Sequence, residues 1–167
     1  DTDRFLFRGT TPRTFDLVSK LIKKTNINFV KLYESLYLRP LKEVKFSGYI
    51  ANNLTIMENG FAYICLPQAI LDEYNVDAAT AGKIVNDFYY IEEVISWRVF
   101  SEDKNNNNIR GSIRSRGPII NEVASKYGGG GHIFASGVKL ESFDKVNDIV
   151  KDLDEVCKKY IEGFFVK

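Results

Sequence analysis

The chain has 167 residues, of which 44% are hydrophobic and 27% charged, the composition of an ordinary globular protein with one full domain or one domain plus a short appendage. Its formal net charge of +1 excludes a global positive field that would attract long nucleic acid, so any anion binding must be local. Because no apolar run reaches the roughly 18 residues of a membrane helix, we expect no membrane partner.

Two cysteines, Cys65 and Cys157, lie far apart in apolar patterns and form no Cys-x-x-Cys pair. We expect both to be buried free thiols, which fits a reducing compartment, and we predict a cytoplasmic protein. The chain starts Asp-Thr-Asp-Arg, with neither an initiator Met nor a signal peptide, which indicates a processed or truncated chain.

Residues 10–50 are predicted to form three helices. Thr10-Thr-Pro-Arg-Thr is a typical helix start, with a hydroxyl cap and a proline in the first turn, and apolar residues then recur at helical spacing. A second amphipathic stripe covers residues 29–37, and a third helix is expected over residues 41–50. We expect all three stripes to be part of the core.

Short β-rich runs follow. Residues 54–57 and 61–66 flank Glu58-Asn59-Gly60, and an Asn-Gly pair between such runs predicts a hairpin. The remaining elements are expected in this order: helices over 68–74 and 77–89, antiparallel strands over 94–100 and 109–114 around a polar loop, a helix over 119–126, a fifth strand over 135–140 and a helix over 145–161. The predicted fold class is α/β, a mixed sheet of about five strands with flanking helices, preceded by a helical segment.

The most informative stretch is Tyr127-Gly-Gly-Gly-Gly-His-Ile, which holds the only histidine. Four glycines allow positive φ angles and close approach to a ligand, and their consecutive amides can form an anion-binding concavity. The plainer alternative, a turn beside a surface histidine, needs only one or two glycines. We therefore interpret this run as a ligand-binding loop, made by Gly128, Gly129, Gly130, Gly131 and His132.

Arginines precede this loop on a predicted strand. Arg110, Ser112, Arg114 and Arg116 share parity, so an extended backbone places them on one face. Guanidinium groups beside a glycine loop suit phosphate. We predict a phosphate- or base-recognition cluster that consists of Ser112, Arg114, Arg116, the glycine amides and His132.

Other kinds of site are excluded by the sequence. A single histidine rules out a His-rich metal cage. The glycines follow a helix and precede a strand, which is the wrong order for a P-loop or a dinucleotide-binding turn. Ser136 stands in Ala-Ser-Gly and not in a nucleophile elbow.

The stretch Arg114-Ser-Arg-Gly-Pro-Ile-Ile-Asn-Glu-Val-Ala-Ser-Lys-Tyr-Gly-Gly-Gly-Gly-His-Ile-Phe-Ala-Ser-Gly137 resembles the signature of the DHHA1 domain in DHH-family phosphoesterases. It is most similar to that of bacterial bifunctional oligoribonuclease/pAp phosphatases of the nanoRNase A type. The resemblance implies a DHHA1-type substrate-binding domain over residues 41–167. Residues 1–40 would then be the end of a DHH metal domain and a helical interdomain linker.

The first residues support this resemblance. Asp1-Thr-Asp-Arg-Phe is similar to the last metal motif of the DHH domain, usually Asp-Thr-Gly-Arg-Phe, although Asp3 replaces the glycine. Asp1 then matches a manganese-ligand aspartate, the one catalytic and metal residue that this chain would hold. The other Mn²⁺ ligands would lie in an N-terminal DHH domain of the same protein, so this chain is expected to be a C-terminal fragment.

The resemblance implies a hydrolase. Two Mn²⁺ ions would activate water for the 3′–5′ exonucleolytic hydrolysis of short oligoribonucleotides and for the hydrolysis of pAp, while the fragment alone is expected to be inactive. The DHHA1 domain would hold the substrate in the cleft between the two domains. Two alternatives stay open: a cyclic-dinucleotide phosphodiesterase, which shares the Gly-Gly-Gly-Gly-His run, and a non-catalytic DHHA1 RNA-binding module. A homodimer also stays open.

Overall fold

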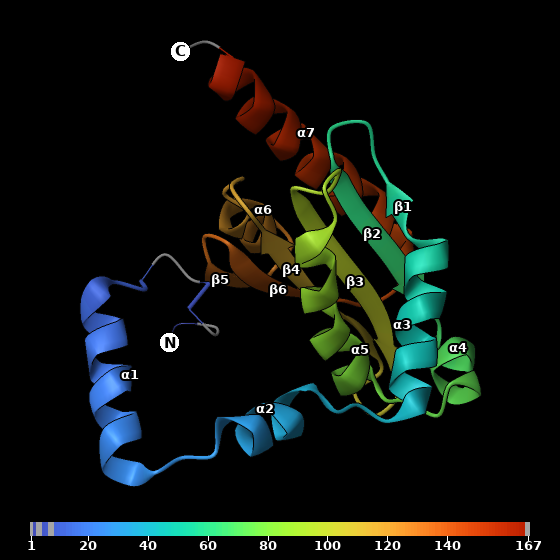
Figure 1. Ribbon diagram of the computed structural model, residues 1–167. Helices are drawn as coiled ribbons and strands as arrows, with labels where there is room; N and C mark the ends of the chain where they lie inside the picture. The colour runs from blue at the N-terminus through green and yellow to red at the C-terminus, as the bar shows by residue number, and fades with distance from the viewer. Residues whose placement is uncertain (1, 3–4, 7–8, 166–167) are drawn as a thin grey trace. The chain divides into compact units, whose positions relative to one another are not determined.

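The computed structural model describes residues 2, 5–6 and 9–165, and the chain divides into two compact units, Asp1–Arg39 and Pro40–Lys167 (Figure 1). The expected manganese ligand Asp1 lies outside the described residues. Among the residues that are described, no helix is long and apolar enough to cross a bilayer.

The first unit contains two helices, α1 (Pro12–Thr25) and α2 (Phe29–Tyr37). The predicted start of α1 is confirmed, with Pro12 in its first turn and the Thr11 amide donating to Oγ1 of Thr14 at 3.1 Å. Neither helix buries a residue, and Phe15 is 53% exposed. The expectation that both stripes belong to the core was therefore wrong. Two short helices contain too little chain to enclose an apolar stripe.

The second unit is built on a six-stranded mixed sheet, which confirms the predicted fold class. Along the sheet the strands lie in the order β1 (Thr55–Ile56), β2 (Phe61–Leu66), β3 (Ser96–Asp103), β4 (Asn108–Ser115), β6 (Ala135–Leu140) and β5 (Gly130–His132). Only β2 and β3 pair in parallel, and the expected β1–β2 hairpin and antiparallel β3–β4 pair are both present.

The sixth strand, β5, was not predicted from the sequence. We expected the glycine run to be entirely loop, but Gly130–His132 forms β5 and pairs with β6. The physical reason is steric. A Cβ on Gly131 would lie 2.7 Å from the Ala135 carbonyl oxygen, and a Cβ on Gly129 would overlap the Gly137 carbonyl oxygen, so only glycines let the chain approach β6 this closely.

Helices cover the two faces of the sheet differently. On one face, α3 (Leu41–Asn53), α4 (Gln68–Glu73), α5 (Ala78–Ile84) and the 3₁₀ turn Val85–Tyr90 pack on apolar residues of β2 and β3, around the buried Trp97. The third predicted stripe is thus core, through Phe46 and Ile50. The outer strands β4, β6 and β5 keep exposed or half-buried side chains on this face.

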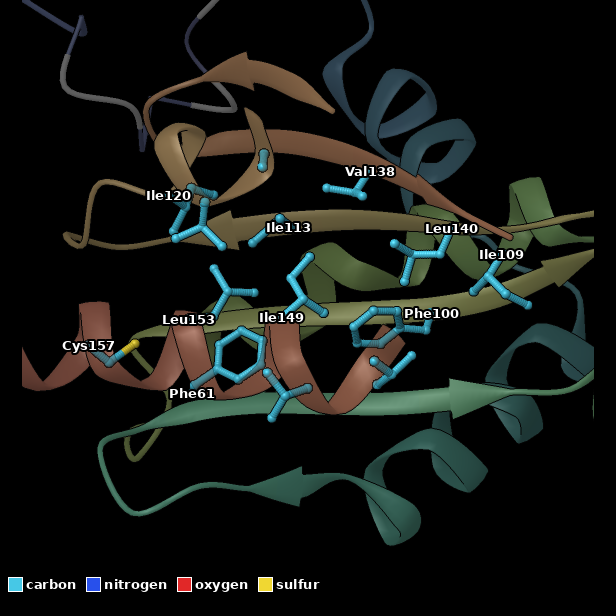
Figure 2. Packing of buried hydrophobic residues seen from close by; sticks show 14 residues of the cluster. Phe61, Phe100, Ile109, Ile113, Ile120, Val138, Leu140, Ile149, Leu153 and Cys157 are labelled. Carbon is cyan, nitrogen blue, oxygen red and sulfur yellow. The ribbon is translucent and has the colours of Figure 1, made fainter. Parts of the chain in front are cut away.

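The opposite face is closed by α6 (Asn121–Lys126) and α7 (Val146–Phe165), which follows the short 3₁₀ turn Phe143–Lys145. Ile149 and Leu153 of α7 pack against Phe61 and Phe100 of the central strands (Figure 2). The core therefore lies on both sides of β2 and β3, and one open face remains over β4, β6 and β5.

Both cysteines are free thiols, as expected. Cys157 is buried, and burial raises its pKa to about 12. Cys65 is only half-buried, contrary to the expectation, and packs against the edge of the core beneath α7. Burial still raises its pKa, with a smaller opposing effect from the nearby Arg98 guanidinium. Neither thiol has the lowered pKa of a reactive cysteine.

Candidate functional site

The open face of the sheet brings two predicted site residues into one row. In the strand register, Arg114 on β4 is opposite Ala135 on β6, and Ala135 is opposite His132 on β5. Directly opposed residues in antiparallel strands point to the same face. Arg114 and His132 therefore lie on one face, two strand spacings or about 10 Å apart at the backbone. That separation allows two long side chains to contact one ligand.

Arg114 is half-buried and retains hydrogen-bonding capacity. Within the described residues its guanidinium hydrogen bond goes to the Ile113 carbonyl oxygen, from Nη1 at 3.0 Å. Burial lowers the pKa of Arg114, which means that the site disfavours its positive charge when no anion is present. A bound anion would offset this penalty and use the remaining donors of the guanidinium fork.

The neighbouring row lies beside a groove. Ser112 on β4 is opposite Gly137 on β6, which is opposite Gly130 on β5. Ser112, Gly137, Gly128 and Gly129 line a groove of about 650 Å³ on this face of the sheet. The sequence parity therefore correctly placed Ser112 and Arg114 on one face, and the fold adds the groove next to them.

The glycine run contributes less to anion binding than four free amides would. The Gly128 amide donates to the Ser125 carbonyl at 3.1 Å, and the Gly129 amide donates to the Ala124 carbonyl at 2.9 Å. Gly128 has φ +71°, the left-handed conformation typical of a helix C-terminus. Two of the four amides thus close the end of α6 instead of forming the anion-binding concavity that we expected. Gly130 and Gly131 belong to β5.

His132 ends β5 and is exposed. Its carbonyl oxygen accepts a hydrogen bond from Oγ of Ser136 at 2.9 Å, which ties the end of β5 to β6. The imidazole stands 6.2 Å from the Phe134 ring, measured between centroids. The backbone is therefore held in place while the ring stays accessible to a ligand.

Arg116 does not lie on the strand face where sequence alternation had placed it with Arg114. The strand β4 ends at Ser115, so the alternation of faces does not extend to Arg116. Its guanidinium donates to the carbonyls of Tyr89 at 3.2 Å, Ile91 at 2.9 Å and Glu92 at 3.2 Å, and also to that of Val94. Arg116 therefore fastens the segment that leads into β3, and most of its donors are used within the protein.

Sequence reasoning did not select two other cations near these residues. Lys83 of α5 and Lys139 of β6 line the same groove as Ser112, together with Arg110. The alternation along residues 135–140 could have placed Lys139 on the outer face with Gly137. Nothing local to Lys83 indicates that α5 crosses this part of the sheet.

No metal centre is found among the described residues, which contain no cluster of three or more His, Cys, Asp or Glu side chains. These residues do not fit a two-metal site by themselves. What they provide is a cationic and hydroxyl-bearing surface suited to binding and orienting an anion.

Comparison with known proteins shows which proteins this chain resembles. Residues 59–159 match the family described as DHHA1 domain. The chain is 36% identical over 160 residues to the bifunctional oligoribonuclease and PAP phosphatase NrnA of Bacillus subtilis, covering 96% of this chain and 50% of that protein. It is 37% identical over 158 residues to the probable enzyme of the same name in Streptococcus mutans, covering 95% of this chain and 50% of that protein.

The fold is also found in a solved structure. An exopolyphosphatase-related protein of Bacteroides fragilis superposes with a TM-score of 0.80 at 23% identity, covering 95% of this chain and 46% of that one. This likeness shows the fold alone. The chain spans about half the length of the curated relatives it matches.

Proposed function

The chain belongs to the DHHA1 domain family, and from this premise we propose that it is the nucleotide-binding half of a manganese-dependent phosphoesterase. Its substrates would be short oligoribonucleotides, degraded from the 3′ end, and pAp. Relatives that carry the names oligoribonuclease and PAP phosphatase match almost the whole chain, which supports this substrate class. The observation that carries the proposal is the row formed by Arg114 and His132 beside an open groove.

In this proposal the chain binds and orients the substrate. The Arg114 fork would make charge-assisted hydrogen bonds to a phosphate, and His132 would contact the same phosphate or the adjoining ribose from β5. Arg116 acts as a positioning residue, since it fastens the segment before β3. The Mn²⁺ ions would activate water, and the DHH half of the protein would hold them, with Asp1 as a further ligand.

The proposal is tested by calorimetric titration of the chain with pAp and with a 5′-phosphorylated dinucleotide. Arg114→Lys keeps the charge but loses the planar fork, and hydrogen bonds to charged groups contribute about 1.5–3 kcal/mol. We therefore expect roughly 10-fold weaker binding or more for this variant. His132→Ala should weaken binding as well, while the circular dichroism spectrum stays unchanged.

Lys158→Gln is the control, because Lys158 is exposed on α7, which packs on the opposite face of the sheet. Equal affinity of wild type, both site variants and the control would show that Arg114 and His132 do not form a nucleotide site. A preference for long RNA over the dinucleotide would instead favour the RNA-binding module.

A further inference from the structure

The groove beside Ser112 carries a concentration of positive charge. Lys83 comes from α5, Arg110 from β4 and Lys139 from β6, so three elements direct cations to one place. Among the described residues that line the groove there is no Asp or Glu. In a chain with a net charge of only +1, this local excess is not a consequence of composition.

Two of these cations are direct neighbours. Arg110 is opposite Lys139 in the β4–β6 register, and like charges in that position repel each other. One carboxylate compensates in part, since Nη1 of Arg110 lies 3.5 Å from Oδ2 of Asp103. Asp103 neutralises part of the Arg110 charge, but it does not line the groove, and Lys83 and Lys139 form no ion pair among the described residues. The remaining repulsion would be relieved by a bound anionic group.

The floor of the groove lacks a side chain at a place where the backbone would accept one. Gly137 lines the groove, and a Cβ on this residue would meet only the Gly111 carbonyl oxygen at 3.6 Å, an ordinary contact. Gly137 does not have a positive φ angle. Backbone strain therefore does not require glycine at this position, and its effect is to keep the groove open.

The charged groove continues the row of Arg114 and His132. Arg110, Ser112 and Arg114 come in this order along β4, and all three lie on the same face of the sheet. Four residues of extended strand span about 13 Å. Successive phosphates of one nucleic-acid strand are separated by at least about 3.4 Å along the axis. The distance from Arg114 to Arg110 can therefore accommodate more than one phosphate.

We propose that Lys83, Arg110 and Lys139 form a second phosphate subsite, which holds the internucleotide phosphates of a two- or three-nucleotide single strand. The strand would lie over Ser112, Gly137 and Gly130 with its terminal phosphate at Arg114 and His132. This inference rests on the proposed function and extends it. Because the groove would bind phosphates beyond the terminal one, the affinity for a nucleotide ligand would increase with its number of phosphates.

The test compares two probes, adenosine 5′-monophosphate and the 5′-phosphorylated trinucleotide of adenylate. Arg110→Gln combined with Lys139→Gln should weaken trinucleotide binding at least 10-fold and monophosphate binding less than 2-fold. The dependence of trinucleotide affinity on salt should also become less steep, by roughly 0.7 in the logarithmic slope for each lost phosphate contact. Lys151→Gln combined with Lys158→Gln, two exposed positions on α7, is the charge-matched control.

A second variant tests the shape of the groove. Gly137→Leu should partly fill the floor, since its Cβ would make only an ordinary contact, and it should weaken binding of the trinucleotide more than binding of the monophosphate. If the wild type binds both probes and the Arg110/Lys139 variant binds them equally well, the second subsite is refuted and the proposed function stands. If the wild type binds neither probe, both are refuted.

Discussion

The replacement Arg98→Met is expected to stabilise the protein. Arg98 is fully buried on β3, on the face that α6 and α7 cover. None of its Nε, Nη1 and Nη2 atoms has a hydrogen-bond partner among the described residues. Its Cζ lies 3.9 Å from the centroid of the Phe100 ring. A buried charge that has an aromatic ring as its main contact destabilises the folded state.

The size of the effect follows from the environment of the guanidinium. Burial lowers the pKa of Arg98 to about 9. At about 1.36 kcal/mol per pKa unit, the lowered pKa corresponds to a penalty on the order of 5 kcal/mol. The cation–π contact already returns up to about 2 kcal/mol. Met has a similar length and packs well on aromatic rings, so we expect a net gain of about 2–3 kcal/mol.

The pH dependence gives this prediction a second, independent readout. Because the pKa of Arg98 is lower in the folded than in the unfolded state, the unfolded chain binds the proton more tightly. The penalty is fully present near neutral pH and decreases as the pH rises through about 9, the folded-state pKa of Arg98. The stability difference between Arg98→Met and wild type should therefore be constant near neutral pH and become smaller above pH 9.

The assay is guanidinium chloride unfolding followed by circular dichroism between pH 7 and 10. Arg13→Met is the control, because this exposed side chain of α1 should change stability by less than about 0.5 kcal/mol. Gly111 supplies a coupling test, since a Cβ there would overlap the Arg98 guanidinium. Gly111→Ala should cost less in the Arg98→Met background than in wild type. A loss of more than about 1 kcal/mol in Arg98→Met at pH 7 would refute the reasoning and show that the guanidinium has a stabilising partner.

Three further predictions concern the glycine run, a loop and activity. Gly129→Ala should lower the free energy of unfolding by about 1–3 kcal/mol, because its Cβ would overlap backbone of β6, whereas Gly130→Ala should change it by less than about 0.5 kcal/mol; equal values in denaturant unfolding would argue against the close approach. In the β3–β4 loop, Asn105→Ser should shift the thermal midpoint by no more than its measurement error, since Asn105 is exposed, and a clear shift would indicate a structural role for the loop. Incubated with Mn²⁺ and pAp, the chain alone should release no phosphate, because the family resemblance assigns most metal ligands to the half that it does not span; turnover of about 1 s⁻¹ or more would contradict this.

Local sequence signals were sufficient for most elements of the fold. The start of α1 at Pro12 depends on caps within four residues, and the β1–β2 hairpin depends on Asn59-Gly60. The antiparallel β3–β4 pair follows from two alternating runs joined by a short polar loop. Such signals involve residues close in sequence, so they can be read without knowledge of the rest of the chain.

Pairing between distant segments could not be derived in this way. The parallel β2–β3 pair spans α4 and α5, and β5 exists only because glycines can approach β6. The apolar stripes of α1 and α2 have the same periodicity as the buried stripe of α3, yet they bury nothing. Periodicity reports which side of a helix is apolar, and it does not report whether another part of the protein covers that side.

The candidate site could likewise be predicted from the sequence only in part. Sequence parity alone placed Ser112 and Arg114 on one face, because alternation is a property of an extended backbone. Only the tertiary structure set His132 in the row of Arg114, turned Arg116 towards the carbonyls before β3 and brought Lys83 to the groove. These relations depend on which strands pair and on which helix crosses the sheet, and both are decided by the burial of the whole core.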